Sequence, residues 1–303
     1  MLFLKRIVLP ACAVLGVVAL AFWFFLWRGS VTVPESSAYP ADLQRLRALA
    51  EGPGLPRALR SIKVAEGHFP GYVAIAGGVP GVDRFPIDWR VFLVEYEDRT
   101  IMIDPVHDRQ LHVAFPFAGD FDDAAYDRMQ EYLKTADMVL ATHEHWDHVG
   151  GVARSPHAEA IRSRVRFTEE QITSSLMREA GFPEGYLESL EPLRYDRYLR
   201  VAPGLVVFDA AGHTPGSQMI FLKLEDGREI LFVGDVVWNE ANLDHLRGHS
   251  RFIGMMGGED LKAQAHQIRW LADLRASGQV TLIVGHDRDQ HAELLRRGIF
   301  DEL

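Results

Sequence analysis

Three histidines and two carboxylates crowd into the six residues from His143 to His148, directly after the short apolar run Met138 to Leu140. Burial in a hydrophobic core would penalise so many polar groups side by side. Neutral imidazole and carboxylate are preferred ligands of zinc and similar divalent metals, and one loop can aim several of them at a single point. The cluster therefore predicts a metal site that begins where a buried strand ends.

Further polar candidates follow other short apolar runs in the same way. Each run has the length and composition of a buried strand, and loops at the ends of several strands can converge on one edge of a sheet. Side chains far apart in sequence can therefore meet around a metal. Glycines beside the candidates fit tight turns with close backbone approach; they are Gly212, Gly216, Gly234 and Gly285. The runs are Met138 to Leu140, Leu205 to Phe208, Ile230 to Val233 and Val280 to Val284.

Five sequence elements occur in an order typical of one family. The first is a strand that ends in Asp104, and the second is the pattern His-x-His-x-Asp-His of residues 143–148. Three shorter pieces follow: Gly212 to Ser217, Phe232 to Asp235 and Ile283 to Asp287. Over residues 85–290 the chain thus resembles the metallo-β-lactamase fold superfamily. The resemblance implies an α/β fold, a four-layer αββα sandwich with two β-sheets packed face to face and helices outside.

The resemblance also implies how seven imidazole and carboxylate groups would hold two metal ions, expected to be zinc, with iron or manganese as alternatives. The first metal would take His143, His145 and His213, the second would take Asp147, His148 and His286, and Asp235 would bridge the two. Asp104 would accept a hydrogen bond from a ligand histidine and fix its tautomer. Its alternative role is that of a turn residue at a strand end.

The kind of reaction is suggested by Asp235. True β-lactamases of this fold carry cysteine or serine at the corresponding position, whereas Val233-Gly234-Asp235 resembles glyoxalase II and acyl-homoserine lactonases. The resemblance therefore implies hydrolysis of an ester, lactone or thioester. Two neighbouring cations would lower the pKa of a bridging water toward 7, and the resulting hydroxide would attack the carbonyl. Asp147 is the candidate catalytic residue, able to orient the nucleophile or move a proton.

Other functions remain open at this stage. A phosphodiesterase or phospholipase can use the same two metals. Mononuclear iron chemistry of the persulfide dioxygenase kind, β-lactamase activity and a binding protein without catalysis are further alternatives. A formal net charge of -10, with no run of Lys or Arg longer than a pair, argues against nucleic acid as a partner. The sequence does not indicate an oligomeric state.

The N-terminus contains a second strong signal. Ile7 to Trp27 has no charged residue and is flanked by Lys5, Arg6 and Arg28. Twenty-one such residues can cross a bilayer, so we expect an uncleaved single-pass anchor and a membrane as partner. The alternative is a cleaved secretory signal with a small-x-small site at residues 36–38. The excess of positive charge before the span favours a catalytic domain on the periplasmic or another extracytoplasmic side.

The rest of the chain divides into a linker and one compact region. We expect an anchor over residues 1–30, a juxtamembrane linker over 31–60 with a short helix near 41–51, and the hydrolase domain over 61–303. Apolar residues at spacings of three and four predict helices over 122–136 and 260–276. Cys12, the only cysteine, lies in the anchor, so no disulfide can form within the chain.

Two apolar loops are candidates for the substrate pocket, because specificity usually resides in long loops over a rigid scaffold. They are His112 to Phe121 and Trp238 to Gly258. We expect them to admit a small molecule with a lipophilic acyl group near the bilayer. Packing of the same aromatic residues against the core is the alternative. The candidate pocket residues are His107, Phe115, Phe117, Trp238, His249 and Arg251.

Overall fold

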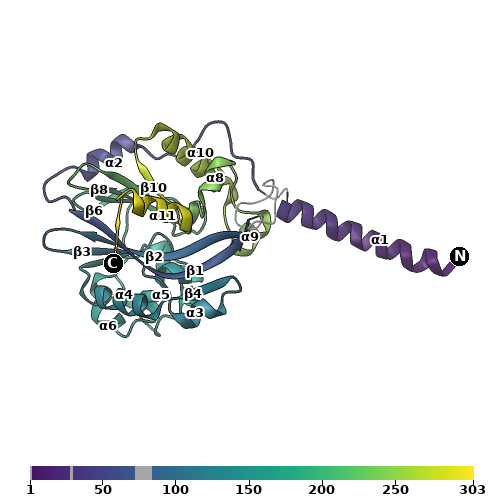
Figure 1. Ribbon diagram of the computed structural model, residues 1–303, viewed down its shortest axis with the longest axis horizontal. Coiled ribbons are helices and arrows are strands. Elements are labelled where there is room, and N and C mark those ends of the chain that lie inside the picture. The colour runs from purple at the N-terminus through teal and green to yellow at the C-terminus, as the bar shows by residue number, and fades with distance from the viewer. Residues whose placement is uncertain (1, 28–29, 72–83) are drawn as a thin grey trace.

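The computed structural model describes residues 2–27, 30–71 and 84–303. Two β-sheets form the centre of the domain (Figure 1). In the first sheet the strands follow the order β11, β1, β2, β3, β5, and β4 pairs with β1. These strands are β1 (Ala58–Pro70), β2 (Arg84–Glu95), β3 (Thr100–Ile103), β4 (Ala118–Phe121), β5 (Met138–Leu140) and β11 (Asp301–Glu302).

The second sheet follows the order β10, β9, β8, β7, β6. Its neighbours pair antiparallel except for β9 and β10, which are parallel, as are β3 with β5 and β1 with β11 in the first sheet. Each apolar run that the sequence marked as a strand forms one. The strands of this sheet are β6 (Tyr198–Ala202), β7 (Leu205–Asp209), β8 (Gln218–Lys223), β9 (Glu229–Phe232) and β10 (Thr281–Ile283).

Strand β8 shows why the two sheets stack. Successive side chains of a strand point to opposite faces. Ile220 and Leu222 accordingly face the apolar layer between the sheets, while Met219 and Phe221 face a second apolar layer on the outside. Because both faces of the strand are buried, the sheet has to be covered on both sides.

Helices cover the outer face of each sheet. Met129 of α4 (Asp123–Thr135) and Val149 of α5 (Trp146–Ala153) pack on the first sheet. Leu46 of α2 (Leu43–Ala50) and Leu271 of α10 (Leu261–Ser277) pack on the second. The layers are therefore helix, sheet, sheet, helix, which confirms the αββα sandwich. The other helical segments are α3 (Arg109–Ala114), α6 (Ala158–Ile161), η3 (Arg162–Arg164), α7 (Glu169–Thr173), η4 (Leu176–Ala180), η5 (Leu187–Ser189), η6 (Gly234–Val236), α8 (Glu240–Asp244), α9 (Arg251–Gly257) and α11 (Arg288–Arg296).

The two long predicted helices begin where their capping residues allow. The Asp122 carboxylate accepts a hydrogen bond from the Ala125 backbone N–H at 3.0 Å and caps α4. The Asp260 carboxylate accepts from the backbone N–H groups of Lys262 and Ala263 and caps α10. Such caps satisfy backbone donors that a helix start leaves unpaired.

Three segments differ from the expectation. The predicted loop His112 to Phe121 contains the end of α3 and strand β4, and the predicted loop Trp238 to Gly258 contains α8 and α9. Part of the expected linker 31–60 packs against the second sheet, where Leu46 and Ala50 of α2 are fully buried. Local sequence predicted the short helix near 41–51, which is α2, but not its packing. It did not predict β4, α8 or α9, because such short elements are held by tertiary contacts more than by their own propensity. The predicted boundary at residue 61 stays a prediction, although β1 already starts at Ala58.

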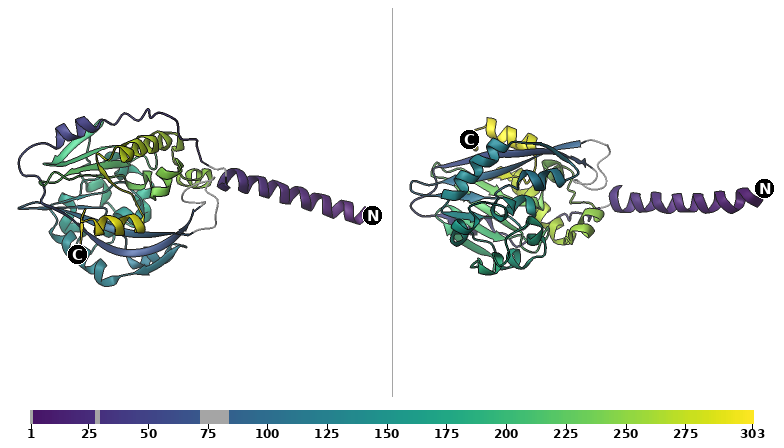
Figure 2. Two further views of the ribbon diagram at one scale, coloured as in Figure 1. Left: turned by 45° about the horizontal axis from the view of Figure 1, so that its top comes forward. Right: turned by 90° about the horizontal axis from the view of Figure 1, so that it is seen from below.

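An apolar helix projects from the domain (Figures 1 and 2). It consists of α1 (Leu2–Phe22) and a π-helical end, η1 (Trp23–Trp27). The 19 residues Val8–Leu26 are long and apolar enough to cross a membrane, and none of that stretch is buried against the domain. A signal sequence at the same place would satisfy the same criteria.

Candidate metal centre

The histidine-rich loop is fixed by Asp104, the residue after β3. Its φ of 55° lies in the left-handed region, which is uncommon for residues other than glycine. In this conformation Asp104 Oδ1 accepts a hydrogen bond from the Thr142 backbone N–H at 2.6 Å, and Oδ2 accepts from Thr142 Oγ1 at 2.7 Å. The segment between β5 and α5 is thereby held at the edge of the sheet, with His145 at the N-cap position of α5.

A first group of possible metal ligands gathers three histidines around one carboxylate oxygen. His145 Nδ1 lies 3.0 Å from His143 Nε2 and 3.0 Å from His213 Nε2. His143 Nε2 and His213 Nε2 each lie 3.7 Å from Oδ2 of Asp235. The four side chains come from three chain segments. His143 and His145 lie in the loop after β5, His213 lies in the loop between β7 and β8, and Asp235 lies in η6 after β9.

A second group lies on the other side of Asp235. His148 Nε2 and His286 Nε2 are 3.3 Å apart, and they lie 3.4 and 3.3 Å from Asp235 Oδ1. Asp147 Oδ2 completes the group at 3.7 Å from His148 Nε2 and 3.5 Å from His286 Nε2. The two groups therefore share Asp235, with one carboxylate oxygen turned toward each.

The spacing of these atoms fits divalent metals. A tetrahedral zinc ion with bonds of about 2.0–2.1 Å separates its ligand atoms by about 3.3 Å, and the quoted separations lie between 3.0 and 3.7 Å. Asp235 Oδ1 is buried and has no hydrogen-bond partner among the described residues. A buried carboxylate oxygen without a donor is costly unless a cation faces it. Each group can thus hold a metal ion.

In three of the candidate ligand histidines, the ring nitrogen Nδ1 lies within hydrogen-bond distance of an oxygen acceptor of the protein. His148 Nδ1 lies 3.0 Å from Oδ2 of Asp104, and His213 Nδ1 lies 2.8 Å from Oε1 of Glu259. His286 Nδ1 lies 3.2 Å from a backbone carbonyl, that of Asp88. When Nδ1 donates its hydrogen to these acceptors, Nε2 keeps a free lone pair directed into the cluster. The three rings are therefore oriented before any metal arrives.

Charges in the cluster stabilise one another. Burial alone would raise the pKa of Asp235, but the cationic forms of His286 and His148 outweigh it and hold that pKa well below its ordinary value. Burial alone would lower the pKa of His148, yet Asp147 and Asp235 raise it well above its ordinary value. Burial lowers the pKa of His145 to about 4. The Asp235 carboxylate is therefore held in its ionised form, the form that can bind a divalent cation.

Two of the predicted turn glycines are required by close approach. Gly234 has a φ of 54°, and a Cβ there would meet the Cβ of Thr142 at 2.9 Å. A Cβ on Gly285 would collide with Oδ1 of Asp235. Glycine at 234 lets the end of β9 approach Thr142 in the loop after β5, and glycine at 285 lets the end of β10 approach Asp235.

Comparison with known proteins places this geometry in a family. A family model described as the metallo-beta-lactamase superfamily matches residues 90–286. The chain belongs to this superfamily. Its overall fold agrees: an N-acyl homoserine lactone hydrolase solved with N-hexanoyl-L-homoserine at its metal center superposes with a TM-score of 0.61 at 18% identity, over 79% of this chain and 96% of that one.

Curated relatives match over part of the chain, at identities between 22% and 36%. The ribonuclease TTHA0252 of Thermus thermophilus is 36% identical over 116 residues, 34% of this chain and 26% of the ribonuclease. An N-acyl homoserine lactonase of Bacillus thuringiensis is 24% identical over 152 residues, 50% of this chain and 56% of the lactonase. The chain therefore spans about a quarter and about half of these relatives. A Bacillus cereus lactonase is 22% identical over 66% of this chain and 81% of its own length.

A cavity of about 310 Å³ opens over the metal centre of this metallo-beta-lactamase superfamily member. Aromatic and aliphatic side chains form most of its wall, and ligand candidates form its floor. Of the six predicted pocket residues, Phe115 and Trp238 line this cavity. Two more wall residues, Ile253 and Met256, lie in the predicted pocket loop Trp238 to Gly258. Sequence reasoning did not select the other apolar wall residues, which are Phe69, Ile87, Trp89, Trp146 and Leu176.

The other four predicted pocket residues lie elsewhere. His107 is fully buried beside Trp146, and burial lowers its pKa to about 3. His249 is also fully buried, with Nδ1 2.9 Å from Glu259. Phe117 packs behind the wall against Phe69, with the ring centroids 5.0 Å apart. These positions correct the prediction that His107, Phe117 and His249 line the substrate pocket, because the segments that carry them fold inward instead of remaining open loops.

Arg251 is the fourth predicted pocket residue that does not line the cavity. Its guanidinium lies over the ring of Phe24, 5.3 Å from the centroid, and therefore contacts the apolar N-terminal helix. Sequence separation of more than two hundred residues gave no sign of this contact.

Two residues at the site have no sequence signal of their own. Trp89 of β2 donates a hydrogen bond from Nε1 to Oδ2 of Asp147 at 2.9 Å. Glu259, in the turn between α9 and α10, contacts both His213 and His249. Trp89 stands among apolar strand residues and Glu259 in an ordinary Gly-Gly-Glu-Asp turn, so their roles emerge only in three dimensions.

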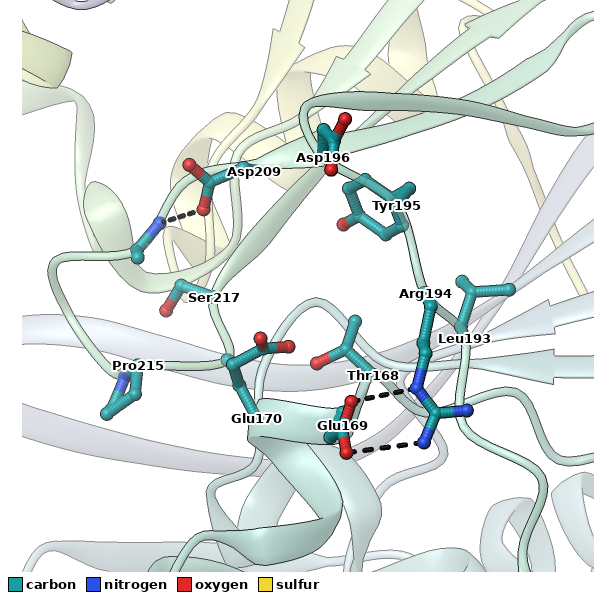
Figure 3. A pocket seen from close by; sticks show the side chains of 12 residues that line it. Thr168, Glu169, Glu170, Leu193, Arg194, Tyr195, Asp196, Asp209, Pro215 and Ser217 are labelled. Carbon is teal, nitrogen blue, oxygen red and sulfur yellow. Dashed lines mark hydrogen bonds and ion pairs between the residues drawn. The ribbon is translucent and has the colours of Figure 1, made fainter.

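A second, larger cavity of about 550 Å³ lies beside the Pro215 to Ser217 turn (Figure 3). Its charged wall includes Glu169, which accepts hydrogen bonds from Arg194. None of the seven candidate metal ligands lines it. The candidate ligands therefore adjoin the smaller, more apolar cavity and not this one.

Proposed function

We propose that this protein is a metal-dependent hydrolase that cuts an ester, lactone or thioester bond, with two zinc ions held by the seven predicted ligands. The observation that carries the proposal is the pair of His/Asp groups that share Asp235 at the floor of an apolar cavity. Membership of the superfamily and the resemblance to N-acyl homoserine lactonases support it. Two divalent cations at these groups would supply an activated water at neutral pH and stabilise charge on the carbonyl oxygen.

The protein's own groups would position the reactants. Trp89 donates to Asp147 Oδ2 and keeps that carboxylate facing His148 and His286. A carboxylate held there can take a proton and later give it to the leaving oxygen or sulfur. Asp235 would keep the two groups at a fixed separation, since each of its oxygens faces one of them.

The walls of the cavity favour an acyl substrate. Phe69, Phe115 and Trp238 present apolar surface around the floor. Their contacts hold them together: the Phe69 ring lies 4.9 Å from the Trp238 ring and 6.0 Å from the Phe115 ring. Burial of an acyl chain against these rings would contribute about 25 cal/mol for each Å² removed from water.

Phosphodiester hydrolysis is the competing function, because one partial relative is a ribonuclease. Among the described residues that line the cavity there is no Lys or Arg, whereas Glu179 and Glu259 are present. A polyanionic phosphate backbone needs clustered cations. The cavity therefore favours a neutral acyl compound over a nucleic acid.

We also propose that α1 anchors the protein as a single membrane-spanning helix with the catalytic domain on the extracytoplasmic side. The length and composition of Val8–Leu26 support the span. Lys5 and Arg6 before it support the orientation.

The experiment uses the full-length protein purified in detergent. Its zinc, iron and manganese would be measured by mass spectrometry, and its activity with a p-nitrophenyl ester, a homoserine lactone and bis-p-nitrophenyl phosphate. We expect two zinc ions per chain and cleavage of the ester or lactone. Asp235→Asn should abolish both, whereas Asp196→Asn, an exposed aspartate outside the site, should preserve them. Preference for the phosphodiester, or iron as the metal that restores activity, would refute the proposal.

A further inference from the structure

Helix α9 exposes apolar side chains at the surface of the domain. Phe252 is 41% exposed, Met255 62% and Met256 70%. Large apolar residues usually avoid water when they stand together, and an exposed group of them marks a contact surface. Met side chains adapt well to irregular and fluid surroundings.

The same helix lies against the end of the apolar N-terminal segment. Figures 1 and 2 show α9 where α1 leaves the domain, and α9 contacts η1. Arg251 lies over the ring of Phe24. Just before α9, the Gly248 backbone N–H donates to Ser30 Oγ at 3.1 Å, and Arg247 pairs with Thr32. The chain is therefore fastened to the start of α9 within a few residues of the predicted membrane span.

Helix α9 also forms part of the cavity wall. Ile253, Met256 and Gly257 line the cavity over the metal centre. The helix thus has one side toward the substrate cavity and another toward the surroundings of η1. A surface that covers α9 would therefore also lie next to the cavity.

The charge of this segment suits a lipid surface. Residues 245–258 contain Arg247 and Arg251 but no Asp or Glu, in a chain whose formal net charge is -10. Cations beside a membrane span are attracted to anionic lipid headgroups. Apolar side chains flanked by Arg are typical of segments that lie in a membrane interface.

We propose that α9 lies in the interface of the bilayer that α1 crosses, so that the cavity opens toward lipid and receives substrates whose acyl chains are dissolved in the membrane. The inference rests on the proposed function for the reaction and on α1 as the membrane span. A stretch of 19 apolar residues extends about 28 Å at 1.5 Å per residue, close to the thickness of the hydrocarbon core. Its end at η1 therefore brings α9 to the level of the headgroups.

Depth in the membrane can be measured without any enzyme assay. Nitroxide labels would be attached at Met255→Cys, Phe252→Cys and Ala160→Cys in the full-length Cys12→Ser protein, reconstituted in phosphatidylcholine nanodiscs. Ala160 is exposed on α6, away from α1 (Figure 1). We expect labels at 255 and 252 to favour collisions with oxygen over the water-soluble reagent chromium oxalate, and the label at 160 to show the reverse. Equal accessibility at all three positions would overturn the inference, and would leave the hydrolase proposal intact.

Substrate chain length gives the second measurement. Met255→Glu and Phe252→Glu place a charge on α9 at positions that do not line the cavity. With dodecanoyl and butanoyl esters offered to protein in lipid vesicles, we expect kcat/KM for the long chain to fall about fivefold or more, with the short chain unchanged. Ala160→Glu is the matched control and should change neither. If both esters are affected equally, or neither, delivery from the bilayer is wrong; if no ester is cleaved at all, the proposed function fails while the depth measurement still decides the position of α9.

Discussion

The Glu259 carboxylate joins two buried histidines at the edge of the metal centre. It lies 2.8 Å from Nδ1 of His213 and 2.9 Å from Nδ1 of His249. Since His213 Nε2 faces the first ligand group, the carboxylate decides whether that nitrogen carries a lone pair or a hydrogen. If His213 binds a metal as proposed, Glu259 would act through it as a positioning residue.

We expect Glu259→Gln to weaken metal binding by about 10-fold to 100-fold, because the amide is a poorer acceptor for the imidazole N–H. Competition with a chromogenic chelator measures the affinity directly. Glu170→Gln, at an exposed position on α7, serves as the control. Unchanged zinc affinity in Glu259→Gln would mean that His213 needs no partner to bind.

Asp88 illustrates a purely structural charge near the site. It is fully buried, with Oδ1 2.6 Å from His291 Nδ1 and Oδ2 accepting from Arg90 Nε at 2.7 Å. Burial alone would raise the pKa of Asp88, but the hydrogen bonds and electrostatic attraction of His291 and Arg90 outweigh it and hold the pKa well below its ordinary value. Its ionised form is therefore part of the stable fold.

The pKa of Asp88 predicts how stability depends on pH. Because its pKa is lower in the folded chain than the unfolded value of about 3.9, the stabilisation is present above that value and is lost as pH falls toward the folded pKa. We expect Asp88→Asn to lower the free energy of unfolding by about 3 kcal/mol at pH 7, since Arg90 and His291 lose their carboxylate. Urea unfolding in detergent should show a constant deficit from pH 8 to pH 5 that shrinks below about pH 4. A deficit that grows on acidification would contradict this assignment.

At the scale of elements, much of the fold follows from local pattern. The strand runs that end near Leu140 and Val233 and the helices near 122–136 and 260–276 could be predicted, because hydrophobic period is encoded in adjacent residues. Helices α8 and α9 could not, since segments of five and seven residues have little helical stability of their own.

The same division applies to the candidate site. The seven clustered ligand candidates lie in short motifs at strand ends, and these motifs can be recognised in the sequence. Trp89 and Glu259 contact the cluster only because β2 and the start of α10 pack beside it. His107 and His249 were expected at the pocket but are buried, since no periodicity tells which side of an irregular segment faces inward.

The contact between the segments that follow the neighbouring strands β9 and β10 gives a test at this scale. Gly285→Ala would place a methyl group against Oδ1 of Asp235, so we expect fewer than two metal ions per chain. Gly185→Ala is the control: its φ of 74° is itself unfavourable for alanine, but nothing lies within 4 Å of the added carbon. It should cost about 1 kcal/mol of stability and retain both metals. Full metal content in Gly285→Ala would show that the strand ends can separate.

At the scale of the whole molecule, the domain that carries the candidate metal ligands contacts an apolar helix. Hydrogen bonding and ring contacts between residues 24–32 and 247–251 join the two parts. The domain is therefore held close to the environment of α1. The apolar cavity and the exposed side of α9 both lie near that environment.

We expect the protein to remain in the membrane fraction after extraction with alkaline carbonate, with the mass of the full 303 residues, 34.1 kDa. An uncleaved span resists such extraction because its apolar residues stay in the bilayer. Mass spectrometry of the extracted protein checks the N-terminus. A soluble form that begins after residue 38 would indicate a cleaved signal instead.

Anomalous diffraction at the zinc edge from crystals grown with zinc is the most direct test of the central claim. We predict two peaks about 3.5–4 Å apart, one on each side of Asp235 and each about 2.0–2.2 Å from one of its oxygens. The first should also contact His143, His145 and His213, and the second Asp147, His148 and His286. A single peak, or peaks that leave Asp235 without a metal, would contradict the account.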